Sequence, residues 1–99
     1  MIEVNYKKNK IINEVKISGH SLYDVVGKDI VCSAVSSIVT TTINDILVLE
    51  KDAIKYEVSE GYILITNTDS EMASKLLDIM INMLKELALS YPKNIKIGG

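Results

Sequence analysis

The chain has 99 residues, which predicts one domain, and 47% of them are hydrophobic while 24% are charged. These proportions are typical of a globular protein and exclude a disordered chain. The net charge is −2, all eleven basic residues are lysines, and Phe and Trp are absent. Because the chain lacks arginines for clamping phosphate and has only tyrosines for stacking on bases, we expect no nucleic-acid binding.

The composition also bears on the compartment. A single cysteine excludes an internal disulfide and fits a reducing compartment, so we expect a cytoplasmic protein. The sequence has no basic segment followed by an apolar run, so no signal peptide is expected. Polar residues interrupt every apolar stretch well before the ~18 residues that a transmembrane helix needs, which predicts that no segment spans a membrane.

The first elements in chain order are two strands. Apolar residues at positions 2, 4 and 6 alternate with polar residues, and the alternation resumes over residues 11–17 after a lysine-rich turn, which predicts a hairpin. The next segment, Ser18–Lys28, has no periodicity and carries Gly19 and Gly27 near its ends, so we predict a long loop. This loop either closes over a bound peptide with the glycines as hinges, or packs permanently on the core.

A long helix is predicted from Asp29 to about Leu49. Apolar residues recur there every three or four positions, and Asp29 stands where an N-cap residue belongs. Many of these residues are Val, Ile or Thr, which are poor helix formers. We therefore expect burial to hold this helix together and the helix to be largely enclosed.

The second half of the chain repeats the order of a hairpin and a helix. Residues 54–58 and 62–66 alternate between apolar and polar or are rich in Ile and Thr, which predicts two further strands. Thr68 and Glu71 then match a capping box, in which Thr68 is the N-cap and Glu71 reaches back to its amide.

The second helix is predicted to end near Ser90 because Pro92 stops it, and residues 93–97 follow as a last short strand. The apolar side of this helix is much wider than the roughly 100° stripe of a surface helix. Either the other helix or a second subunit must cover the excess. We therefore predict a symmetric homodimer that buries part of it.

The predicted elements follow one another in the order ββαββαβ. This order indicates an α+β fold with a mainly antiparallel sheet and two helices packed against one of its faces. We expect residues 1–99 to form a single domain, because no linker interrupts the pattern.

The residues with the clearest chemistry are one histidine and one cysteine. His20 lies in the predicted loop and Cys32 in the first turn of the predicted helix, where free backbone N–H groups stabilise a thiolate and hold an oxyanion. An imidazole nearby can take the thiol proton and return it to a leaving amine. Gly19 allows close approach of a substrate. The alternative is a buried cysteine and an unrelated, solvated histidine. We expect no metal or cofactor.

The sequence around these two residues resembles the bacterial ribosomal-processing cysteine protease family, Prp. Gly19-His20 is followed by Gly27-Lys28-Asp29-Ile30-Val31-Cys32-Ser33-Ala34-Val35-Ser36. The family pairs a Gly-His with a Gly-x-Asp-Ile-Val-Cys-Ala-Ala-x-Ser segment at this separation. This chain departs from that pattern at Ser21 and Ser33, where alanine is common, and its residues 22–26 are more apolar than the family's.

The resemblance implies a dimeric cysteine protease that supports ribosome assembly. It would remove a short N-terminal extension from the large-subunit ribosomal protein numbered twenty-seven, cutting after an aromatic residue and before a small one. The resemblance assigns His20 and Cys32 as the catalytic pair, and it matches Gly19, Asp29 and Ser36 to further positions of the motif.

Two of these positions have alternative roles. Asp29 either caps the helix or orients the ring of His20, and the cap is favoured because a carboxylate beside a thiolate opposes its ionisation. Ser36 lies one turn after Cys32, so its hydroxyl bonds either the substrate backbone or the Cys32 carbonyl.

Two other classes of function compete with a protease. A non-catalytic, dimeric ribosome-assembly factor of the same fold would tolerate alkylation of Cys32, whereas a protease would not. The ending Gly98-Gly99 and the hairpin followed by a helix are also typical of ubiquitin-like modifiers. The second long helix, and a last strand too close to the two glycines to leave a free tail, argue against a modifier.

Overall fold

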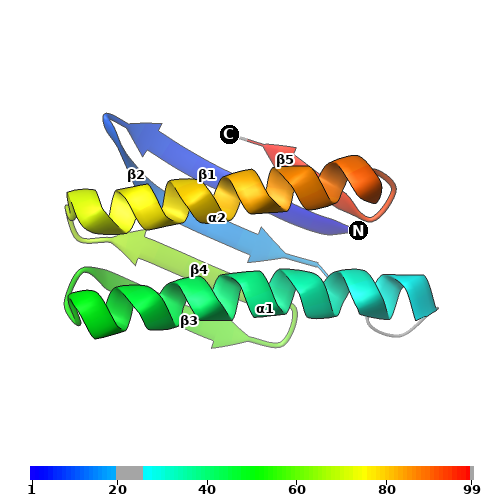
Figure 1. Ribbon diagram of the computed structural model, residues 1–99, viewed down its shortest axis with the longest axis horizontal. Coiled ribbons are helices and arrows are strands. Elements are labelled where there is room, and N and C mark those ends of the chain that lie inside the picture. Colours follow the sequence, from blue (N-terminus) through cyan, green and yellow to red (C-terminus); the bar gives the residue numbers. More distant parts are fainter. Residues whose placement is uncertain (20–25, 99) are drawn as a thin grey trace.

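The computed structural model describes residues 1–19 and 26–98, and within these ranges the side chains of all but residues 26–29. The elements in chain order are β1 (Ile2–Asn9), β2 (Ile11–Ser18), α1 (Val26–Leu49), β3 (Ile54–Ser59), β4 (Tyr62–Asn67), α2 (Glu71–Ser90) and β5 (Ile95–Gly98). This ββαββαβ order is the one that the sequence predicts (Figure 1).

Within the described residues, five strands form one sheet in the order β3-β4-β2-β1-β5. Neighbouring strands are antiparallel, except β1 and β5, which are parallel. Both helices lie across the same face of this sheet, α1 over the β3–β4 side and α2 over the side of β2, β1 and β5 (Figure 1). The predicted α+β fold, with a mainly antiparallel sheet and two helices on one face, is confirmed.

The core lies between the helices and the sheet, because each element turns its aliphatic residues to the same layer. The buried residues of α1 recur every three or four positions: Val31, Val35, Val39, Ile43 and Ile46. Those of α2 do likewise: Leu77, Met80, Ile81 and Leu84. Val15 and Ile65, on the central strands, have no exposed surface. Burial of this kind offsets the poor helix propensity of the Val and Ile residues in α1.

The opposite face of α1 is open, so the expectation that this helix is largely enclosed is wrong. Among the described side chains of α1, half of the exposed ones are small and carry hydroxyl groups: Ser33, Ser36, Ser37, Thr40 and Thr41. Serine and threonine are weak interruptions, so Ile30–Leu49 is long and apolar enough to cross a membrane, with 28% of it buried. The prediction that polar residues exclude such a stretch is therefore wrong for α1. Length and composition remain weak evidence of a span, since the core helix of a folded protein passes the same test.

Helix α1 begins at Val26, three residues earlier than predicted. Asp29 is therefore the fourth residue of the helix and not its N-cap, because an N-cap residue has a non-helical backbone. Gly27 misled the prediction, since it lies inside the helix rather than at the end of a loop. The predicted loop shrinks accordingly, because β2 reaches Ser18. Of the residues that remain in it, 20–25 lie outside the described residues, and so does the predicted closure over a peptide.

Helix α2 ends at Ser90 as predicted, but its N-cap is Ser70 and not Thr68. The Ser70 hydroxyl accepts a hydrogen bond from the amide of Ala73 at 3.1 Å. The Thr68 hydroxyl instead donates to the carbonyl oxygen of Ala53 at 2.8 Å, so it is used to tie two strand ends together. The last strand starts two residues later than predicted because a turn follows the helix, in which Tyr91 accepts the amide of Asn94.

Candidate active site

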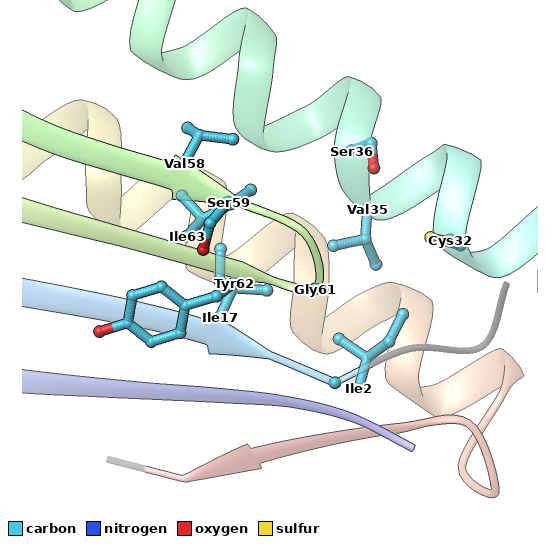
Figure 2. A pocket seen from close by; sticks show the side chains of 11 residues that line it. Ile2, Ile17, Cys32, Val35, Ser36, Val58, Ser59, Gly61, Tyr62 and Ile63 are labelled. Carbon is cyan, nitrogen blue, oxygen red and sulfur yellow. The ribbon is translucent and has the colours of Figure 1, made fainter.

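A cavity of about 210 Å³ lies between the first half of α1 and the strand ends beneath it (Figure 2). Its lining is mainly aliphatic: Ile2, Ile17, Val35, Val58 and Ile63. Val35 points from α1 toward the strands, and none of the described residues in the lining is charged. The cavity therefore suits an uncharged, apolar side chain, because a charge would lose its hydration there without gaining a partner.

Cys32, the only cysteine, lies on the α1 wall of this cavity. Its thiol is free and half-buried, so an incoming group can reach it. Because α1 starts at Val26, Cys32 is the seventh helical residue and stands in the second turn. Its amide already belongs to the hydrogen-bond ladder of the helix, and the dipole of a helix end acts mainly within the first turn. The predicted support of a thiolate by the helix start is therefore weaker than the sequence suggested.

Gly19 lies on the opposite wall, directly after β2. Its amide donates to the carbonyl oxygen of Gly61 at 3.0 Å, and its φ is +105°, which L side chains rarely adopt. A Cβ built on Gly19 would overlap the carbonyl oxygen of Met1. The main chain of Met1 and Ile2 therefore fills the space beside Gly19 where we expected a substrate to approach. This glycine is required first of all by the fold.

Ser36 lines the cavity one helical turn after Cys32, as the spacing predicts. Thr42, on the same helix, donates its hydroxyl hydrogen to the carbonyl oxygen of Ile38 at 2.9 Å. Among the interactions of the described residues, no equivalent bond joins the Ser36 hydroxyl to the Cys32 carbonyl. That the Ser36 hydroxyl bonds the backbone of a bound peptide stays a prediction.

The other two predicted site residues are not placed by the structure. His20 lies outside the described residues, and the side chain of Asp29 does too. That His20 approaches Cys32 stays a prediction, as does any bond from Asp29 to the His20 ring. What the structure does bring together is Cys32, Ser36 and Gly19, the residue that precedes His20 in the chain.

Sequence reasoning missed the strand side of the cavity. Ser59 and Gly61, at the turn between β3 and β4, line it from the strand side, and Ile2 closes it from the N-terminus. No local sequence pattern predicts that these residues line the cavity, because they come together only when the sheet forms. Among the described residues, no group of three or more His, Cys, Asp or Glu side chains is placed to hold a metal ion.

A family model described as cysteine protease Prp matches residues 1–96. The chain belongs to this Prp family. A ribosomal processing cysteine protease Prp from Staphylococcus aureus strain Mu50 is 25% identical, over 97% of this chain and 94% of that protein. The match covers nearly the full length of both, so the resemblance drawn from the Gly-His and Cys segments is confirmed. As a Prp family member, the chain is a cysteine protease.

Solved structures agree with the family's fold. The S. aureus ribosomal processing protease Prp, in complex with a covalently linked product peptide, has a TM-score of 0.88 and 25% identity, over 99% of this chain and 98% of that one. A protein from Streptococcus mutans, at 23% identity, shares the fold with a TM-score of 0.86 over 99% of this chain and 92% of its own.

Proposed function

We propose that this protein removes a short N-terminal extension from the large-subunit ribosomal protein numbered twenty-seven. One observation supports the proposal most. The chain's only cysteine stands on the wall of an uncharged cavity, opposite the glycine that precedes its only histidine. Family membership supplies the protease chemistry, and the name of the S. aureus relative supplies the ribosomal substrate.

In the proposed reaction, Cys32 is the nucleophile and His20 is the general base and acid. His20 takes the thiol proton as the sulfur attacks the carbonyl carbon, and then gives that proton to the departing amine, which releases the mature ribosomal protein. Water then attacks the thioester that links the extension to Cys32, which releases the extension as a carboxylic acid and restores the thiol. The reaction consumes one water molecule and needs no metal or cofactor.

The cavity fits the expected cleavage position, which follows an aromatic residue and precedes a small one. Its aliphatic lining can receive the aromatic ring, and burial of a large apolar side chain contributes about 1.5–3 kcal/mol. The proposed function therefore predicts preference for an uncharged residue before the cut.

The test is cleavage of the precursor, followed by mass spectrometry. We expect the protein to shorten ribosomal protein twenty-seven at its N-terminus, and Cys32→Ala and His20→Ala to abolish this with unchanged circular dichroism. Ser33→Ala, an exposed neighbour of Cys32, is the matched control and should cleave normally. Iodoacetamide should inactivate the wild type. If the alkylated protein or the Cys32→Ala variant still cuts, the Cys-His pair is wrong. If the wild type cuts nothing but binds the precursor, the non-catalytic assembly factor is favoured.

We also propose that the protein is a cytoplasmic homodimer. The outer surface of α2 exposes Ile79 and Met83, which are 55% and 46% accessible, beside the uncovered hydroxyl-rich face of α1. Small residues let helices of two subunits approach closely, and the two apolar side chains would then be buried.

Light scattering at micromolar concentration should give twice the 11.0 kDa chain mass. Ile79→Glu should give a monomer, and a monomeric wild type would contradict the proposal.

A further inference from the structure

Strand β3 carries two apolar side chains that the fold leaves uncovered. Ile54, Tyr56 and Val58 share the helix-covered face of the sheet, because side chains alternate along a strand and Ile54 is buried. Their exposed fractions rise along the strand, from 4% to 49% to 64%. The partner of Tyr56 on β4, Ile65, is fully buried. Helix α1 therefore buries Ile65 on β4 but leaves the second half of β3 open.

The uncovered residues follow from the way α1 and β3 are joined. A short connection after Leu49 holds the end of α1 against the start of β3, where Ala53 and Ile54 are buried. The strands run obliquely beneath α1, so helix and edge strand diverge toward the other end of the sheet (Figure 1). At that end Val58 lines the same cavity as Cys32. Tyr56 and Val58, which we call the β3 strip, thus continue the cavity along the open edge.

An exposed apolar edge strand is normally a liability, since it invites pairing with other chains. The opposite face of β3 is protected in the usual way, because Lys55 and Glu57 are charged and exposed. The β3 strip has no such protection, although it lies beside a cavity that opens on a nucleophile. Exposed apolar side chains beside this cavity are suited to bind an apolar segment of a peptide that reaches Cys32.

The size of the cavity indicates how much of a ligand it holds. At about 210 Å³ it is smaller than the roughly 300 Å³ of the smallest ordinary ligand pockets, so it takes one large side chain or two small ones. An extended peptide places side chains of one face about 7 Å apart, which is also the spacing of alternate residues along a strand. A peptide with one side chain in the cavity therefore brings further side chains over Val58 and Tyr56.

We propose that the β3 strip is a binding subsite for apolar side chains of the extension, upstream of the cut. This inference rests on the proposed function. The upstream side is favoured because the extension is the only part that distinguishes the precursor from its product, and specificity must be read from a difference. Val58 contacts the residue nearer the cut, and Tyr56 a residue further upstream. Both act by binding and neither takes part in the chemical steps.

The test uses a fluorogenic peptide with Phe before the cut, Ala after it, and Leu at the four positions upstream of the Phe. Val58→Asp and Tyr56→Ser are the variants, and Glu57→Thr, between them on the other face of β3, is the matched control. Val58 is 64% exposed, so its substitution should leave the fold intact. Unchanged circular dichroism and an unchanged rate of Cys32 alkylation by iodoacetamide confirm this.

We expect Val58→Asp to lower kcat/KM about tenfold through KM, with kcat within twofold of the wild type, and Tyr56→Ser to have a smaller effect of the same kind. The four upstream Leu residues of the peptide are then replaced by Ser, one at a time. At one position this replacement should lower kcat/KM of the wild type but not kcat/KM of the Val58→Asp variant, which indicates that Val58 contacts the side chain at that position. A kcat/KM of the Val58→Asp variant within twofold of the wild type would overturn the proposal. The proposal would also be overturned if the effect of Val58→Asp depended only on the peptide residues after the cut.

A separate readout keeps the two proposals apart. The same peptide, labelled with a fluorophore, is bound to the Cys32→Ala protein with and without Val58→Asp. If the wild type cleaves nothing, the proposed function fails, whereas weaker binding of the peptide to the double variant still supports the subsite. Equal binding by both proteins overturns the subsite.

Discussion

The two ends of the sheet are built in opposite ways. At the end where β4 runs into α2, the buried Asn67 side chain donates to the carbonyl oxygens of Ile12 and Ser70 and accepts the amides of Asp69 and Ser70. Ser74 adds a bond from the Ile12 amide at 2.9 Å. At the end where Cys32 lies, the strand ends and α1 enclose an uncharged cavity (Figure 2). One end is closed by a polar network, and the other is left open.

This difference separates stability from function along one small sheet. Buried polar groups that are fully bonded fix the connection between β2, β4 and α2, and losing one partner costs the desolvation of the others. The open end has a cavity in place of such a network, and Cys32 is half-buried there. Substitutions at the closed end should therefore change the free energy of unfolding, and substitutions at the open end should change cleavage.

The largest expected effect is at Gly19, where one substitution should change both the free energy of unfolding and cleavage. Gly19→Ala would place a Cβ on the Met1 carbonyl at a φ of +105°, and we expect a loss of about 3 kcal/mol or more in the free energy of unfolding. Cleavage should fall as well, because Gly19 lines the cavity and precedes His20. Urea unfolding and peptide cleavage measure the two effects. Ser18→Ala is the control, and a Gly19→Ala protein of normal stability would show that the Met1 contact does not constrain the site.

Asn67→Ala should have the next largest effect, on stability alone. The substitution removes four hydrogen bonds and leaves a buried carbonyl of Ile12 without this donor, so we expect a loss of about 2–3 kcal/mol. Because the network lies at the closed end, kcat/KM at low temperature should stay within twofold. Asn82→Ala, an exposed residue of α2, serves as the control in urea unfolding. A tenfold fall in kcat/KM at unchanged stability would mean that the two ends are coupled.

Ser70→Ala tests the helix cap at the same end. Loss of the bond to the Ala73 amide should cost about 1 kcal/mol, again without an effect on cleavage. Glu71→Ala is the informative comparison, because a capping box around Thr68 would make Glu71 the more important residue. Chemical unfolding of the two variants decides between the caps, and a larger loss for Glu71→Ala would restore the one that the sequence predicted.

The order of elements could be predicted because it depends on local periodicity, which also indicated the end of α1 at Leu49. The end of α2 at Ser90 could be predicted because Pro92 follows it. The helix starts could not. Thr68 and Ser70 are both common caps by residue type, and Thr68 is instead engaged by the carbonyl oxygens of Asp52 and Ala53, which the hairpin brings near. The start of α1 was placed too late because a glycine inside a helix looks like a loop residue.

The candidate site divides in the same manner. The motif identified Cys32, Ser36 and Gly19, and the fold brings all three to one cavity. The strand residues that complete the lining are far apart in the sequence, so no local pattern points to them. The reason for Gly19 was also hidden, because it depends on Met1, which is distant in the sequence and is brought next to Gly19 by the pairing of β1 with β2.

The smallest expected effect is at Ser36, and it bears on the open end alone. If the Ser36 hydroxyl bonds the backbone of a bound peptide, Ser36→Ala removes one neutral hydrogen bond, worth about 0.5–1.5 kcal/mol, which corresponds to a fall in kcat/KM of roughly twofold to twelvefold. The free energy of unfolding should change by less than about 0.5 kcal/mol, because Ser36 is exposed and alanine is a better helix former. Ser37→Ala, the exposed neighbour that does not line the cavity, is the matched control, since it makes the same change in helix propensity. Equal kcat/KM for Ser36→Ala and Ser37→Ala would show that the Ser36 hydroxyl does not bind the substrate. A selective loss in Ser36→Ala would place a substrate contact on the same helical face as the nucleophile, one turn further along α1.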